Sequence, residues 1–324
     1  MRRGGAAGPA FPAPVALGLV ALLACASPPP LEARYRPAEN LLEVIAVLRR
    51  HVPDDTYRFE PARDFSGRNV YRSTLLRLEN IEAVHGDALR AGRFDAVIDF
   101  AKARALERLR SFDLAAQHYR AAAERDETLR EEALRSAAVC DALQEAAELG
   151  GDAAGPEDDR SGQGLGPEEV VSRSEQRIRL LEVLMEDVRE THHRYVVEEE
   201  IERADVLRAR WFESARRVLP DGNLRALSEW QRVIARHRES RNANRHLLAL
   251  ADLYAALARD YVDEHPPESL LFDPAGFEEL VDSASRLYEA VANQDGTVEK
   301  LEAARRLEAF LAFTLRVDRD RFTP

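Results

Sequence analysis

Two pairs of residues in the sequence have the spacing of metal ligands on a helix. Glu82-x-x-His85 and Glu190-x-x-His193 each place a carboxylate and an imidazole one helical turn apart. Di-iron carboxylate bundles use two such pairs together with two further glutamates. The sequence therefore allows a metal-binding helical bundle or a di-iron-type enzyme built on these four residues. Because such pairs arise by chance in a glutamate-rich chain and neither segment is strongly apolar, we keep this interpretation as the alternative.

The remaining chemistry-bearing residues do not form a catalytic motif. The sequence contains no nucleophile elbow, phosphate-binding loop, zinc-protease motif or closely spaced pair of cysteines. Cys140 follows three apolar residues and is expected to be a buried core residue. His192-His193 would suit a metal or pH site, and Glu198–Glu200 a cation patch, but such residues usually lie on solvated helix surface. We therefore predict a protein that is not an enzyme, with no cofactor and no small-molecule substrate.

The N-terminus predicts export. Two arginines precede the apolar segment 10–24, which is too short to span a bilayer, so residues 1–24 are predicted to be a secretory signal peptide. The segment ends in Leu22-Leu23-Ala24-Cys25, which resembles the bacterial lipobox. This resemblance implies cleavage before Cys25 and lipidation of its thiol. An ordinary cleavage site near Ala24-Cys25-Ala26 is the alternative.

The charge of the chain limits what it binds. The sequence has 46 basic and 58 acidic side chains and a formal charge of −12, which becomes −14 once the signal peptide and its two arginines are removed. No cluster of Lys and Arg is present, so nucleic acid is not an expected partner and charge would not hold the protein on anionic lipid. Acyl chains on Cys25 would provide the membrane anchor. The proline-rich residues 25–37 are predicted to be a tether. By resemblance to enterobacterial lipoproteins, Ala26 implies an outer-membrane lipoprotein that faces the periplasm.

Nearly all of the mature chain has the apolar periodicity of α-helices, which predicts an all-α fold. We predict an N-terminal helical repeat region at 38–149 and a C-terminal one at 172–324. Between them, residues 150–171 are rich in Gly, Pro and acid and are predicted to be a disordered linker or loop. Residues 172–218 predict helix with a bend near Glu198–Glu200. The other helices are predicted at 41–53, 75–85, 96–109, 112–125, 129–147, 224–237, 243–262, 277–293 and 299–316.

Several predicted helices share a pattern of small and large residues. A small residue, an aromatic residue four positions later and another small or β-branched residue three positions after that begin at Ala115, Ala226 and Ala284. This spacing lets two helices of a hairpin pack closely. The residues that would pack the hairpins are Phe112, Ala115, Tyr119, Ala122, Ala226, Trp230, Leu250, Ala251, Tyr254, Ala284 and Tyr288.

These segments resemble the tetratricopeptide repeat. The resemblance implies helical hairpins stacked as an α-solenoid, with a groove that binds a protein or peptide through polar side chains such as Arg245 and Asp252. The match is incomplete, because Asp99 stands where the family has an aromatic residue, and an insertion containing the predicted helix cap Asp273-Pro274 separates Ala251 from Ala284. A plain helical bundle is the alternative, since alanine-rich helices produce such matches by chance.

Together these features predict a non-catalytic scaffold in the bacterial envelope, held by a lipid anchor and bound to an envelope protein or peptide. The metal-binding bundle and a purely structural spacer without a partner are the competing hypotheses. The aromatic residues of segment 54–71 would either hold this segment against the first hairpins or form a contact surface.

Overall fold

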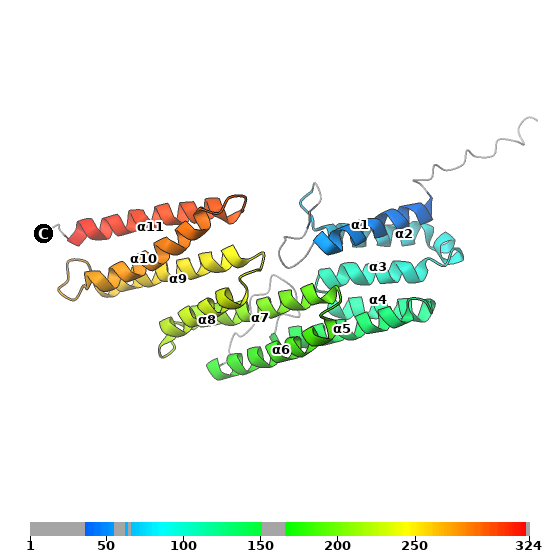
Figure 1. Ribbon diagram of the computed structural model, residues 1–324, viewed down its shortest axis with the longest axis horizontal. Helices are drawn as coiled ribbons and strands as arrows, with labels where there is room; N and C mark the ends of the chain where they lie inside the picture. The colour runs from blue at the N-terminus through cyan, green and yellow to red at the C-terminus, as the bar shows by residue number, and fades with distance from the viewer. Residues whose placement is uncertain (1–35, 55–61, 64–65, 151–165, 322–324) are drawn as a thin grey trace, which may run out of the picture.

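The computed structural model describes residues 36–54, 62–63, 66–150 and 166–321 (Figure 1). Within these residues the regular structure is entirely helical, apart from one isolated bridge between Arg63 and Asn69, and the predicted all-α class is confirmed. No helix in this part of the chain is long and apolar enough to cross a membrane. The predicted signal peptide, Cys25 and most of the predicted tether lie outside the described residues, as does half of the segment 54–71.

Successive helices pack side by side in an elongated array, with α1 and α11 at opposite ends (Figure 1). Second neighbours also touch, because α1 contacts α3, α5 contacts α7 and α9 contacts α11. The helices are α1 (Pro37–Asp54), α2 (Val70–Ala91), α3 (Asp95–Arg108), α4 (Phe112–Arg125), α5 (Arg130–Gly150), α6 (Pro167–Val188), α7 (His193–Ala215), α8 (Gly222–Arg236), α9 (Ala243–Glu264), α10 (Pro274–Ala292) and α11 (Glu299–Arg321).

Local sequence signals set several helix ends as predicted. Helix α4 has the predicted bounds, and the turn before it places Arg110 at a φ of 64°. At the start of α10 the side chain of Asp273 accepts hydrogen bonds from the backbone N–H groups of Ala275 and Gly276, and Pro274 follows in the first turn. The predicted cap is therefore confirmed, because Asp satisfies backbone donors that the first turn leaves unpaired.

The region around α6 differs from the prediction. Helix α6 begins at Pro167, so residues 167–171 of the predicted linker are helical, and Ser172 lies inside the helix rather than at its cap. The predicted bend near Glu198–Glu200 is wrong, because α7 runs without interruption through this segment. The chain instead reverses after Val188, where the hydroxyl of Thr191 donates to the Val188 carbonyl at 2.8 Å. This turn contains neither Gly nor Pro, which explains why the sequence pattern did not reveal it.

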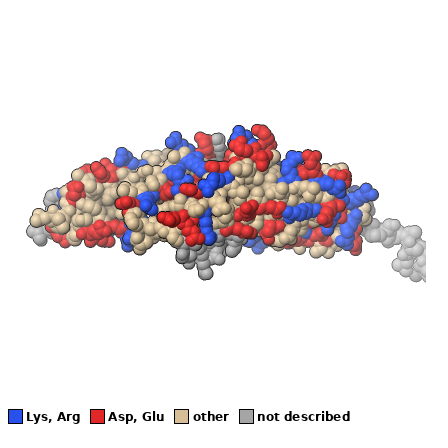
Figure 2. Space-filling model, turned by 90° about the horizontal axis from the view of Figure 1, so that it is seen from below, with Lys and Arg blue, Asp and Glu red and all other residues tan. Residues whose placement is uncertain are grey.

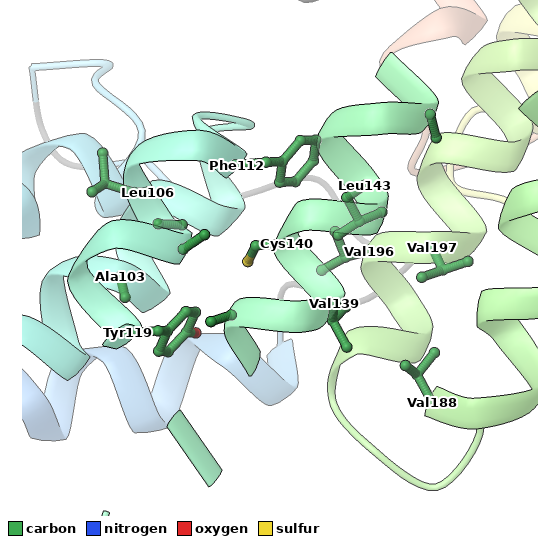
Figure 3. Close-up of a cluster of buried hydrophobic side chains, with 14 of the residues drawn as sticks. Ala103, Leu106, Phe112, Tyr119, Val139, Cys140, Leu143, Val188, Val196 and Val197 are labelled. Carbon is green, nitrogen blue, oxygen red and sulfur yellow. The ribbon is translucent and has the colours of Figure 1, made fainter. Parts of the chain in front are cut away.

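One apolar core joins the two predicted repeat regions. Side chains of α3, α4 and α5 pack against those of α6 and α7, two helices that come later in the sequence than residues 151–165 (Figure 3). Cys140 is fully buried in this core, which confirms its predicted place, and burial raises the pKa of its thiol. Most of the core residues are small or aliphatic; those labelled in Figure 3 are Ala103, Leu106, Phe112, Tyr119, Val139, Cys140, Leu143, Val188, Val196 and Val197.

The predicted hairpin-packing residues lie between helices. All of them are buried except Tyr254, which is half-buried. The three predicted aromatic residues of α4, α8 and α10 share a further contact, because each donates a hydrogen bond to a carboxylate of the preceding helix. The pairs are Tyr119 with Glu107 (2.9 Å), Trp230 with Glu213 (2.9 Å) and Tyr288 with Asp252 (2.6 Å).

Candidate functional site

A groove of about 350 Å³ lies between α7 and α9, with Trp230 of α8 among its lining residues. These two helices pack less closely than the second neighbours α5 and α7 do. The predicted groove residues Arg245 and Asp252 both line it. Its charged lining consists of four arginines and four carboxylates: Arg203, Arg210, Arg241, Arg245, Glu199, Glu202, Glu213 and Asp252.

The carboxylates of the groove are bound to other parts of the protein. Glu202 accepts from His246 Nε2 at 2.5 Å and from the Ser240 hydroxyl at 2.7 Å. Glu199 pairs with Arg241 at 3.1 Å. Glu213 accepts from Trp230, and Asp252 accepts from Tyr288 and pairs with Arg306. Each acidic side chain of the groove therefore has a partner within the protein, and these contacts hold the walls of the groove together.

Arg210 differs from the other charged groove residues. It is exposed on α7 and forms no ion pair with any residue that the structure describes. In contrast, Arg203 lies 3.6 Å from Glu200, and Arg245 donates to Glu299 at 3.0 Å. The groove thus exposes a cationic side chain even though the whole chain is acidic.

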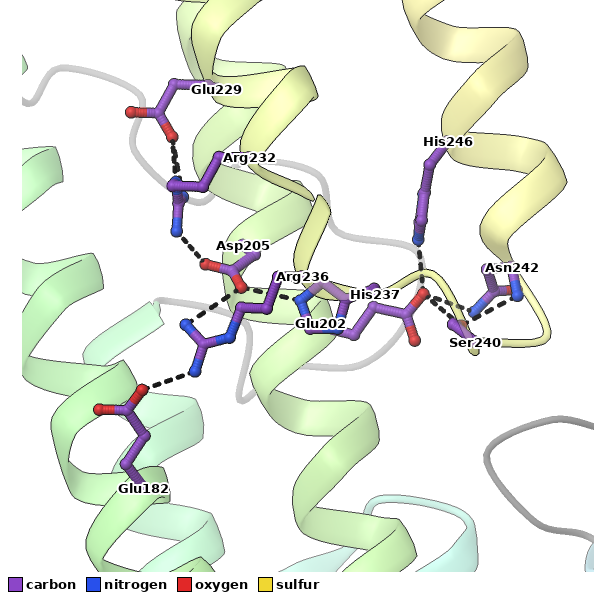
Figure 4. A network of polar contacts seen from close by, with 10 residues as sticks. All are labelled: Glu182, Glu202, Asp205, Glu229, Arg232, Arg236, His237, Ser240, Asn242 and His246. Atoms are coloured by element: carbon purple, nitrogen blue, oxygen red, sulfur yellow. Dashed lines mark hydrogen bonds and ion pairs between the residues drawn. The ribbon is translucent and has the colours of Figure 1, made fainter. Parts of the chain in front are cut away.

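A buried polar network fixes the turn between α8 and α9 against α7 (Figure 4). Asp205 of α7 accepts from His237 Nε2 at 2.8 Å and from Arg232 at 2.6 Å. Burial alone would raise the pKa of Asp205, but the hydrogen bond from His237 and the neighbouring arginines outweigh it and lower this pKa. The same balance, with His246 and Ser240 as donors, lowers the pKa of Glu202. These hydrogen bonds favour the ionised form of both carboxylates and connect the turn between α8 and α9 to α7.

The predicted solvated surface of α7 is partly buried. Glu200 is 3% exposed and accepts from Arg110 Nε at 2.6 Å and from Arg177 at 3.0 Å. Arginines in α7 and directly after it pair with other helices, because Arg208 donates to Glu229 of α8 at 2.7 Å, and Arg216 and Arg217 both pair with Asp260 of α9. The expectation of solvated surface was wrong for Glu200 and His193, because charge spacing alone does not show which face a second helix covers.

The predicted di-iron ligand set is not assembled. Glu82 pairs with Lys102 of α3, and Glu190 is exposed in the turn before α7. His85 has non-helical backbone angles (φ −125°, ψ 16°), which break the one-turn relation to Glu82. His193 is the exception, because it is buried beside His192 and Glu107. Sequence reasoning missed Glu107, since it is far from both histidines along the chain and no motif connects them.

The described surface has no large area of one charge on the face seen in Figure 2, where acidic and basic side chains alternate in small groups. Pairs between neighbouring helix turns, such as Arg135 with Glu131 at 2.7 Å, account for part of this pattern. Such exposed pairs contribute little to stability. No known protein-family model matches the sequence, and a search of curated proteins finds no match.

Proposed function

We propose that the protein is a non-catalytic scaffold of the bacterial envelope, anchored through a lipid on Cys25, that binds a protein or peptide segment in the groove between α7 and α9. In this proposal the hairpins form a tetratricopeptide-like solenoid. Three features support it. Successive helices pack side by side, and second neighbours also touch. In addition, an aromatic residue of each of α4, α8 and α10 donates a hydrogen bond to a carboxylate of the preceding helix.

The observation that carries the proposal is the difference between the carboxylates and Arg210 in the groove. Its carboxylates are occupied by internal partners, whereas Arg210 is exposed without one among the described residues. A groove of this kind suits an extended segment with an acidic side chain opposite Arg210. It is open and polar, unlike the enclosed apolar pockets that bind most small molecules.

Site-specific photocrosslinking in native membranes tests this binding mode. A photoreactive amino acid replaces Arg245 in the full-length protein, and the same molecule carries either Arg210→Glu or the control Arg286→Glu on the exposed face of α10. We expect one crosslinked partner, with a yield that falls at least tenfold in Arg210→Glu and stays unchanged in Arg286→Glu. Equal yields in the two variants would contradict binding in this groove.

The lipid anchor is tested separately. Cys25→Ala removes the thiol that would be acylated, so we expect the protein to lose metabolic labelling with palmitate and to leave the membrane fraction. Unchanged membrane association of Cys25→Ala would show that the cysteine is not the anchor, and the ordinary cleavage site would then be favoured.

A further inference from the structure

A second group of buried polar side chains lies away from the groove, where the end of α3 meets the turn between α6 and α7. Glu107 of α3 and His193 of α7 are each 1% exposed. Nε2 of His192 lies 3.3 Å from one carboxylate oxygen of Glu107, and Nε2 of His193 lies 3.2 Å from the other. One ligand atom from each of the three residues lies within 4.8 Å of the others.

These short distances are not hydrogen bonds. The ring nitrogens are not oriented to donate to the carboxylate, so both Nε2 atoms and Oε1 of Glu107 are buried without a hydrogen-bond partner. Buried polar atoms in folded proteins almost always have one. The three atoms therefore lie close together without satisfying one another.

The spacing fits a tetrahedral metal ion. Zinc binds imidazole nitrogen and carboxylate oxygen at about 2.0–2.2 Å, so neighbouring ligand atoms of a tetrahedral site are about 3.3–3.4 Å apart. Nε2 of His192 lies 3.3 Å from Oε1 of Glu107 and Nε2 of His193 lies 3.2 Å from Oε2, so a small rotation of the carboxylate would bring one of its oxygens to this distance from both nitrogens. Two histidines and one carboxylate are also a ligand set that zinc commonly has in proteins.

Two hydroxyl groups orient these ligands. The Tyr119 hydroxyl donates to Oε2 of Glu107 at 2.9 Å. The Thr191 hydroxyl donates to the Val188 carbonyl, so its oxygen can accept from Nδ1 of His193, which lies 3.4 Å away. This contact places the imidazole proton on Nδ1 and leaves the lone pair of Nε2 directed at the cluster. Histidine ligands of metals are held by outer contacts of this type.

The charges are those of a cation site. Glu107 supplies a carboxylate, and neither Lys nor Arg pairs with it among the described residues; Arg104 lies 4.0 Å from Glu132 instead. The carboxylate is thus left for a cation.

We propose that Glu107, His192 and His193 bind one Zn²⁺ ion, which ties α3 to the turn between α6 and α7. The His192 side chain is 17% exposed and provides the entry route from solvent. This site is distinct from the groove between α7 and α9, so the scaffold function does not depend on it.

Metal binding by the untagged mature chain tests the proposal. The protein is treated with a chelator, dialysed and titrated with Zn²⁺ or Co²⁺. We expect one equivalent of zinc by elemental analysis, a rise in Tm on zinc addition and the intense visible bands of tetrahedral Co²⁺. Absence of retained zinc, or weak octahedral Co²⁺ bands only, would overturn the proposal and leave the cluster as a structural feature of the core.

Variants locate the ion. We expect Glu107→Gln and His193→Gln each to weaken zinc binding at least a hundredfold, and Tyr119→Phe to weaken it about tenfold, because Tyr119 only orients a ligand. His85→Gln, from the other Glu-x-x-His pair, is the matched control and should bind zinc normally. Unchanged binding in His193→Gln, or its loss in His85→Gln, would contradict the assignment. If a ligand variant fails to fold, the Co²⁺ spectrum of the wild-type protein still shows whether the bound metal is tetrahedral, as proposed, or octahedral, which would overturn the proposal.

Discussion

Helix α7 carries two buried groups of histidines and carboxylates that differ in how well their polar atoms are paired. Toward α9, Nε2 of His246 and Nε2 of His237 donate to Glu202 and Asp205 at 2.5 and 2.8 Å. At the start of α7, the corresponding nitrogens of His192 and His193 lie 3.3 and 3.2 Å from Glu107 and form no hydrogen bond. The same residue types thus make a closed network in one place and an open ligand set in the other.

The difference lies in orientation and in the neighbours available. The network at Glu202 and Asp205 includes Ser240, Asn242, two arginines and two histidines from the α8–α9 region (Figure 4), and both carboxylates have several donors. Glu107 has one hydrogen-bond donor, the Tyr119 hydroxyl, and the two imidazoles beside it form no hydrogen bond with it. A fully paired network rigidifies the fold, whereas unpaired buried groups indicate a site with another purpose.

The largest effect should come from opening the closed network. Glu202→Ala leaves His246 and Ser240 buried without their acceptor, so we expect the free energy of unfolding to fall by about 3 kcal/mol. Urea denaturation followed by circular dichroism measures this change. Glu278→Ala on the exposed face of α10 is the control and should change stability by less than about 0.5 kcal/mol. A similar small effect for Glu202→Ala would show that the network is not important for stability.

The open cluster should respond to metal instead. Zinc at a hundred times its Kd should raise the free energy of unfolding of the wild-type protein by about 2.7 kcal/mol, and should have no effect on Glu107→Gln. Without metal, Glu107→Gln should change stability by about 1 kcal/mol or less, because the amide oxygen can still accept from Tyr119 and a buried charge is removed. If the free energy of unfolding of metal-free Glu107→Gln fell by about 3 kcal/mol, the Glu107 group would stabilise the fold as the Glu202 network does, and the proposed difference would be contradicted.

The two groups should lose their contributions to stability at different pH values as the solution is acidified. The pKa of His192 is lowered on folding, so the unfolded chain takes up its proton first, and this contribution to stability is lost as pH falls from about 7 through the ordinary histidine value. The pKa of Asp205 is also lowered, so its contribution persists above the ordinary value of about 3.9 and is lost below about pH 4. Urea denaturation of the metal-free protein at pH 7, 5.5, 4 and about 2.5 measures both steps. His192→Gln should reduce only the loss of stability that begins near pH 7, and Asp205→Asn only the loss below about pH 4. If either substitution changed both losses, the two groups would not be independent.

Arg210 should matter least for stability. Because it is exposed and forms no ion pair with a described residue, Arg210→Glu should change the free energy of unfolding by less than about 0.5 kcal/mol while it reduces photocrosslinking in the groove. A large loss of stability would show that Arg210 supports the fold and that its effect on crosslinking is indirect.

Local signals made most helices predictable from the sequence. The bounds of α4 and the cap of α10 follow from residues within a few positions of each helix end. The turn between α6 and α7 was missed because Arg189 to His192 contains neither Gly nor Pro, and an apolar periodicity continues through it.

The buried sites were less predictable, because they depend on which helices meet. Glu190-x-x-His193 has a ligand spacing only if both residues lie on one helix, yet α7 begins at His193. Glu107 comes close to His193 only because α3 lies against the start of α7, a contact that no local pattern shows. Arg245 and Asp252 both line the space between α7 and α9, and whether a partner binds there stays a prediction.

X-ray absorption spectroscopy of the zinc-loaded wild-type protein tests the metal site most directly. The account predicts a first shell of about four nitrogen and oxygen atoms at roughly 2.0–2.1 Å, with the outer-shell scattering of two imidazole rings. A six-coordinate oxygen shell without imidazole scattering would contradict it, and Glu107, His192 and His193 would then be a buried polar cluster without a ligand.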